Sequence, residues 1–153
     1  MKLLNNISTL YRVPVDGAHD DVDAVSDAAV AWEGDTIRYA GPAAELPAQF
    51  AEAETFDAGG RCVVPGLIDC HTHLCFGGWR GNEFAARLEG VSYQEIQASG
   101  GGINSTVTAT RSAGKRELLE KASAVLEDMG RLGVTTVEAK SGYGLNRNDE
   151  IKQ

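Results

Sequence analysis

Apolar and polar residues alternate over short distances in the first 60 residues of the chain. Residues 3–13 (LLNNISTLYRV) form one such run, and residues 29–41 (AVAWEGDTIRYAG) form two more on either side of Gly34. A period of two predicts strands with one buried face, and a turn residue between two such runs predicts a hairpin. The intervening residues 16–27 (DGAHDDVDAVSD) are acidic and predict a loop. Residues 1–60 are therefore predicted to form a small β-rich domain.

The pattern changes after residue 60, and a second domain is predicted over residues 61–153. Residues 63–68 are mostly apolar, and a pair of glycines precedes them. A short apolar run of this kind is typical of a strand that is buried on both faces, as in a parallel sheet. Pro65 must then lie at the start of the strand or at an irregularity, because proline has no N–H to donate.

Helical signals follow, and then a further strand. Ser92 with Glu95 three residues later predicts a capping box at the start of a short helix. Apolar residues at steps of three and four predict an amphipathic helix over residues 115–132, with Gly133 as its end. The β-branched residues 134–140 predict a strand. Strand, helices and strand in this order predict a parallel βαβ unit and an α/β fold.

Composition limits the classes of function. The 153 residues include 14 Lys and Arg against 22 Asp and Glu, a formal net charge of −8. This charge disfavours nucleic acid and anionic membrane surfaces as partners. The three cysteines are an odd number without a C-x-x-C pair, which favours free thiols in the cytoplasm. We find no signal peptide and no stretch near the about 18 apolar residues of a spanning helix.

His71 and His73 flank Thr72 directly after the apolar run. Side chains two positions apart on a strand point to the same side, so both imidazoles are expected on one face where the strand ends. Parallel α/β sheets present their ligands at this end of the strands. Imidazole is a common ligand of zinc and other first-row metals. A metal site at this position is one interpretation, and ordinary surface or core histidines are the other.

Three segments resemble a known family. VPGLIDCHTHL resembles the first barrel strand of the amidohydrolase superfamily, and FGGWRGNEFAARLEGVSYQEIQASGGGINSTVTATRSA with GVTTVEAKSGYGL resembles the imidazolonepropionase family within it. The resemblance implies a (β/α)8 TIM barrel, of which residues 61–153 would be the first βα units. Residues 1–60 would be the N-terminal part of the small composite β-sandwich domain. It also implies hydrolysis of the cyclic amide of 4-imidazolone-5-propanoate to N-formimidoyl-L-glutamate in histidine degradation.

The resemblance assigns roles to four residues. His71 and His73 would ligate one zinc or iron ion per subunit, and the sequence does not distinguish the two metals. Arg80 would bind the substrate, since a guanidinium can hold a carboxylate through two N–H groups. Tyr143 would contact the imidazolone ring. Lys140 lies on the second strand, where the bridging lysine of binuclear relatives does not belong, so a mononuclear site is expected.

Other polar residues near these motifs have less specific interpretations. Cys75 alternates with the histidines and could be a further ligand, although a small apolar filler is the favoured interpretation. Asp69 and Glu138 are candidate acceptors for the imidazole N–H groups. The glycines at 100–102 could turn backbone N–H groups toward a ligand, but they match no nucleotide-binding motif. His19 lies in the acidic loop and is expected to be solvated.

No histidine follows His73, and catalytic zinc sites usually have three protein ligands. The remaining ligands and the general acid and base are therefore expected beyond Gln153, in a longer enzyme of which this chain is the N-terminal part. A complete barrel needs about 250 residues, so the chain by itself is expected to be inactive, to bind metal weakly and to fold poorly. Two alternatives stay open: another amidohydrolase, such as a cyclic amidase or an aromatic deaminase, and a non-catalytic truncated module. A homodimer is a further candidate assembly.

Overall fold

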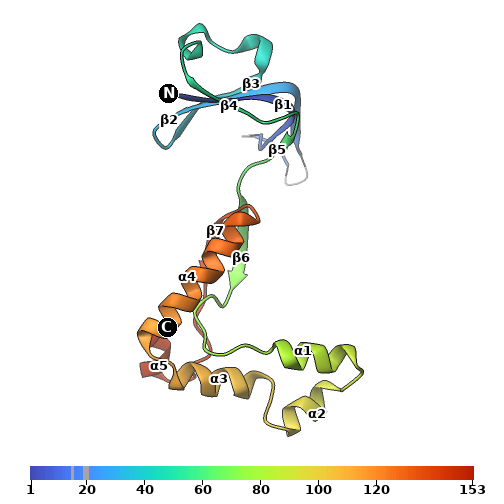
Figure 1. The fold of residues 1–153 in the computed structure, drawn as a ribbon, viewed down its shortest axis with the longest axis vertical. Helices are drawn as coiled ribbons and strands as arrows, with labels where there is room; N and C mark the ends of the chain where they lie inside the picture. The colour runs from blue at the N-terminus through green and yellow to red at the C-terminus, as the bar shows by residue number, and fades with distance from the viewer. Residues whose placement is uncertain (15, 19–20) are drawn as a thin grey trace. The chain divides into compact units, whose positions relative to one another are not determined.

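The computed structural model describes residues 1–14, 16–18 and 21–153 (Figure 1). His19 lies outside the described residues. The chain divides into two compact units, Met1–Pro65 and Gly66–Gln153. No helix among the described residues is both long and apolar enough to cross a membrane.

The first unit is a five-stranded sheet with two short 3-10 helices. Its hydrogen-bonded strands follow the order β3-β2-β1-β4, and β5 also pairs with β1. The pairs β1–β2 and β2–β3 are antiparallel, whereas β4 and β5 run parallel to β1. The strands are β1 (Lys2–Arg12), β2 (Asp23–Glu33), β3 (Thr36–Pro42), β4 (Glu54–Asp57) and β5 (Cys62–Val63), and the 3-10 helices are η1 (Ala43–Glu45) and η2 (Ala48–Phe50).

Apolar side chains form two clusters on this sheet. Neighbouring residues of β2 enter different clusters, because successive side chains of a strand point to opposite faces. Phe50, which is 1% exposed, closes the cluster that contains Ala29. Ile7, also 1% exposed, lies in the cluster that contains Ala28. The sheet therefore has a small core on each face.

The predicted hairpin is confirmed, whereas the predicted loop is partly wrong. β2 and β3 meet at Gly34, which has a positive φ of 61°. The acidic segment, however, becomes strand from Asp23 onward. Asp23 pairs in register with Arg12 of β1, and the two side chains form an ion pair. This cross-strand pair lets an acidic residue enter the sheet.

The second unit joins two parallel strands through a series of helices. These elements are β6 (Leu67–Thr72), α1 (Gly81–Leu88), α2 (Tyr93–Ala98), α3 (Ile103–Ser112), α4 (Lys115–Arg131), β7 (Val134–Ala139) and α5 (Arg147–Lys152). β6 and β7 are parallel, which confirms the predicted βαβ unit. Helix α4 packs beside β7, and α1 follows the end of β6 (Figure 1). Both strands therefore deliver their carboxyl ends to the same edge.

Two expectations for the apolar run at 63–68 are wrong. The run is not one strand, because it is interrupted after Val63 and resumes at Leu67, and Pro65 lies in the gap. Proline cannot donate a ladder hydrogen bond, which accounts for the break. Nor is β6 buried on both faces, since Ile68 is 70% exposed. Among the described residues, β6 pairs with β7 alone, and this leaves its apolar side chains accessible.

The helix signals are confirmed where they are local. Ser92 and Glu95 form a complete capping box at the start of α2. Gly133 follows α4 with a φ of 93°, a conformation that glycine adopts at little cost. Helix α1 was not predicted. It begins after Arg80 without a side-chain cap, so it lacks the sequence signal that identifies α2.

Candidate functional site

Two imidazoles and a phenol meet where β6 and β7 end. His71 and His73 have ring centroids 5.5 Å apart. The ring of Tyr143, from the segment after β7, lies 5.0 Å from the ring of His73. The parallel pairing of the strands causes this meeting, because it places both carboxyl ends at one edge.

The side chain of His73 has a buried ring nitrogen, Nδ1, without a hydrogen-bond partner among the described residues. A buried polar atom without a partner costs free energy, so such atoms are uncommon in folded proteins. Gly142 packs closely on the ring: a Cβ at this position would lie 3.0 Å from Cε1 and 3.3 Å from Nδ1 of His73. His71 is exposed, whereas His73 is half-buried.

The segment that carries Tyr143 is fixed from two sides. Oε1 of Glu150 accepts the N–H groups of Gly144 and Leu145 at 2.8 and 2.7 Å. On the other side, Nε of Arg111 donates to the carbonyl of Gly144 at 2.7 Å. A hydrogen bond with the Ser141 side chain, followed by those with the backbone N–H groups, lowers the pKa of Glu150. The sequence analysis missed Arg111 and Glu150, which fix the backbone next to Tyr143, because neither residue is part of a catalytic pattern.

Arg80 lies apart from this cluster in its contacts. Its Nη1 atom is 3.7 Å from Oε2 of Glu83, one turn into α1. It makes no hydrogen bond or cation–π contact with His71, His73 or Tyr143 within the part of the chain that the structure describes. The structure therefore brings three of the four sequence-predicted residues together and places Arg80 against a carboxylate.

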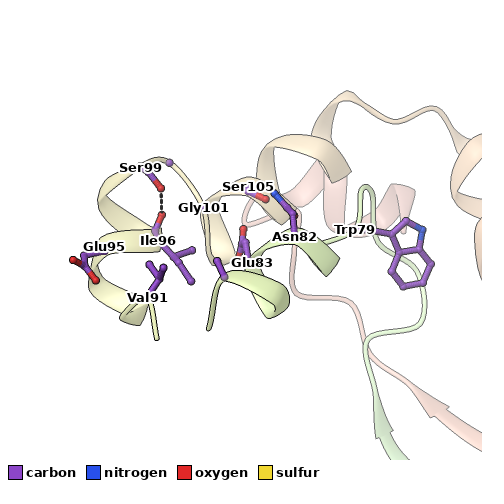
Figure 2. A pocket seen from close by; sticks show the side chains of 11 residues that line it. Trp79, Asn82, Glu83, Val91, Glu95, Ile96, Ser99, Gly101 and Ser105 are labelled. Atoms are coloured by element: carbon purple, nitrogen blue, oxygen red, sulfur yellow. Dashed lines mark hydrogen bonds between the residues drawn. The ribbon is translucent and has the colours of Figure 1, made fainter. Parts of the chain in front are cut away.

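A cleft of about 410 Å³ lies next to Glu83, bounded by α1, α2 and the start of α3 (Figure 2). Neither histidine lines it. Oε1 of Glu83 accepts the N–H of Gly102 at 3.0 Å. This backbone N–H of the glycine run at 100–102 therefore bonds to a side chain of the protein and not to a ligand. Ile96 forms part of the apolar wall, and Ser99 Oγ donates to its carbonyl at 2.8 Å. Tyr143 does not line the cleft either, so the cleft is separate from the cluster of His71, His73 and Tyr143.

The two candidate acceptors for the imidazole N–H groups have other partners, and Cys75 contacts neither histidine by a hydrogen bond among the described residues. Asp69 Oδ1 accepts the backbone N–H of His71 at 3.1 Å rather than an imidazole N–H. Glu138 forms an ion pair with Lys140, and that lysine lowers the pKa of the Glu138 carboxyl. Cys75 is half-buried, and its carbonyl accepts from Gln153 Nε2 at 2.7 Å. The described residues contain no group of three or more His, Cys, Asp or Glu side chains that could hold a metal ion.

No known family profile matches the chain. Curated relatives that are named imidazolonepropionase do match, and three of them illustrate the similarity. The protein from Roseobacter denitrificans is 48% identical over 86% of this chain, that from Sphingopyxis alaskensis 52% over 88%, and that from Pseudomonas aeruginosa 56% over 84%. The chain spans about a third of the length of these relatives, between 32% and 33%.

Two solved enzyme structures have a fold similar to that of this chain. Guanine deaminase from C. acetobutylicum, solved with bound guanine, aligns with a TM-score of 0.55 at 16% identity. It covers 99% of this chain, and the alignment covers 32% of that enzyme. A triazine hydrolase from Arthrobacter aurescens aligns with a TM-score of 0.51 at 23% identity, over 92% of this chain and 28% of its own. These alignments confirm the predicted α/β fold class.

Proposed function

We propose that this chain, which is a homologue of the imidazolonepropionases, contributes the first part of the active site of a metal-dependent cyclic-amide hydrolase. The substrate would be 4-imidazolone-5-propanoate and the product N-formimidoyl-L-glutamate. The observation that carries the proposal is the cluster of His71, His73 and Tyr143 at the shared edge of β6 and β7. The identity to curated relatives supports the choice of this reaction over that of an aromatic deaminase.

The donor set fits part of a metal centre. Neutral imidazole is a ligand for zinc and for iron, and the buried Nδ1 of His73 has no competing partner among the described residues. His71 and His73 would therefore hold one ion. When bound, such an ion supplies Lewis acidity that activates water near neutral pH and polarises a carbonyl. We propose that the further ligands and the general acid and base lie beyond Gln153, consistent with relatives that are about three times as long.

The substrate would be oriented by Tyr143 and Arg80. The phenol of Tyr143 can both donate and accept a hydrogen bond, and its position beside His73 suits contact with a planar ring held there. The guanidinium of Arg80 suits the propionate carboxylate. Its 3.7 Å pairing with Glu83 leaves N–H donors over, because a guanidinium has five of them.

We propose that this activity is cytoplasmic and that its substrate is a small anionic molecule. Cys62, Cys70 and Cys75 are all free thiols, which favours a reducing compartment. The net charge of −8 argues against nucleic acid and anionic membranes as partners. Assembly as a homodimer stays a prediction.

The test uses the protein expressed from the complete reading frame. We expect loss of the imidazolone absorbance in the wild type, and at least about a thousandfold lower turnover together with loss of bound metal when His71 and His73 are both alanine. Cys70→Ala is the matched control, because Cys70 is exposed on the same strand and alternates to the other face. Retention of metal and rate by the double variant would refute the proposal, as would turnover of guanine or a triazine with none of the imidazolone.

A further inference from the structure

A lysine of α4 is held between two aromatic rings of a distant loop. The Nζ atom of Lys121 lies 3.2 Å from the ring centroid of Phe76 and 3.9 Å from that of Trp79. The two rings are themselves edge to face, with centroids 5.4 Å apart. Nζ also donates a hydrogen bond to the carbonyl of Gly78. One cation thus contacts three residues of the same loop, of which Gly78 is 43 residues away in sequence.

The loop that Lys121 holds leads into the proposed site. The ring of Phe76 lies 6.0 Å from that of Tyr143, which in turn lies 5.0 Å from His73. Arg80 directly follows Trp79 in the chain. A displacement of the loop would therefore change the packing of one proposed substrate contact and the position of the other.

The opposite side of the loop is fixed by α3. The N–H of Gly77 donates to Oγ1 of Thr110 at 2.9 Å, in a buried position. Gly77 also lies so close to α3 that a Cβ would come within 2.5 Å of the backbone of Ala109. The loop is consequently in contact with both α3 and α4. Lys121 provides the contacts from α4.

Lys121 keeps its charge although its side chain is partly buried. Burial lowers the pKa of this lysine to about 8, while Cys75 and Glu117 act in the opposite direction. The ammonium group is therefore still the main form at neutral pH. Two ring faces and a carbonyl are partners that favour the charged form, because ring faces carry negative potential. An ordinary solvated lysine needs no such partners, so this arrangement indicates a specific structural task.

We propose that Lys121 is a positioning residue for the substrate: its ammonium holds residues 76–80 so that Arg80 and the Phe76–Tyr143 contact face the ring bound beside the histidines. This inference rests on the proposed function. The lysine itself is not proposed to touch substrate or metal.

The test compares Lys121→Met with Lys121→Arg in the protein expressed from the complete reading frame. Methionine keeps the length of the side chain and removes the charge, whereas arginine keeps both a cation for the rings and a donor for the carbonyl. We expect Lys121→Met to raise KM about three- to tenfold with kcat within about twofold and metal content unchanged. Lys121→Arg should restore KM to within about twofold of the wild type. Lys115→Met is the control, an exposed lysine of the same helix.

A second readout does not depend on turnover. Hydrogen–deuterium exchange of the backbone over residues 76–80 should be faster in Lys121→Met and normal in Lys121→Arg. If the wild type opens no imidazolone ring, the proposed function fails, and the exchange result still decides whether Lys121 holds the loop. If Lys121→Met folds poorly, Trp79→Leu repeats both measurements with the lysine kept. Unchanged KM and unchanged exchange would overturn the inference, as would a lowered kcat with unchanged KM.

Discussion

The buried hydrogen bond between the Gly77 N–H and Thr110 allows a quantitative prediction for Thr110→Val. Thr110 is fully buried, and its Oγ1 accepts from Gly77 at 2.9 Å. Valine replaces the acceptor with a methyl group of similar shape, so the N–H of Gly77 stays buried without a partner. Such an unsatisfied donor costs about 1–3 kcal/mol. Relief is restricted, because Gly77 already lies against the backbone of Ala109 and has no room to move inward.

Local opening of the loop is the quantity to measure. Since about 1.4 kcal/mol corresponds to tenfold, the cost predicts exchange over residues 76–80 that is about 5- to 150-fold faster in Thr110→Val. Thr106→Val is the matched control: Thr106 lies one turn earlier on α3, is 4% exposed, and makes no hydrogen bond to the loop among the described residues. Exchange that stays within about twofold of the wild type in Thr110→Val, or that rises equally in Thr106→Val, would refute the reasoning.

Three further predictions follow from single contacts. Because Lys121 has a pKa of about 8, it is charged below that pH and neutral above it, so the fluorescence of Trp79 should change with a midpoint near pH 8 in the wild type and stay flat in Lys121→Met. Ser92→Ala removes the cap of α2 and should cost about 1 kcal/mol, seen as faster exchange in the first turn of that helix. Gly142→Ala should lower the metal content of the complete protein without changing its circular dichroism, because the new Cβ would lie 3.0 Å from Cε1 of His73.

The elements that the sequence predicts well are those with local signals. Gly34 provides the positive φ of a tight turn, and Ser92 with Glu95 caps a helix through contacts within four residues. Gly133 ends α4 for the same kind of reason. The pairing of β6 with β7 follows from the order of the elements, because parallel strands need a crossover between them. The turn and the two helix ends depend on neighbouring residues alone, and the strand pairing depends on the order of the elements.

Features that depend on distant contacts were not predictable. Asp23 enters a strand because Arg12 lies opposite it, and the acidic composition around it indicates a loop instead. The apolar residues of β6 predict burial, yet the described residues place only β7 beside that strand, and Ile68 stays exposed. The role of Lys121 is hidden for a similar reason. Its aromatic partners lie more than 40 residues earlier, and a lysine on an amphipathic helix is ordinarily solvated.

The site therefore has two kinds of residue, and they should fail in different ways. His73 and Tyr143 belong to motifs at strand ends, where sequence patterns indicate chemistry. Lys121 and Glu150 hold the two loops that follow β6 and β7, and no motif indicates them. Under the proposed function, loss of a ligand such as His73 would remove the metal, so the reaction rate would fall at every substrate concentration. Loss of Lys121 or Glu150 would leave the metal bound and widen the range of loop positions, which would weaken substrate binding before it weakens the chemical step. Variants at Glu150 should for this reason resemble Lys121→Met in their kinetics and not His73→Ala.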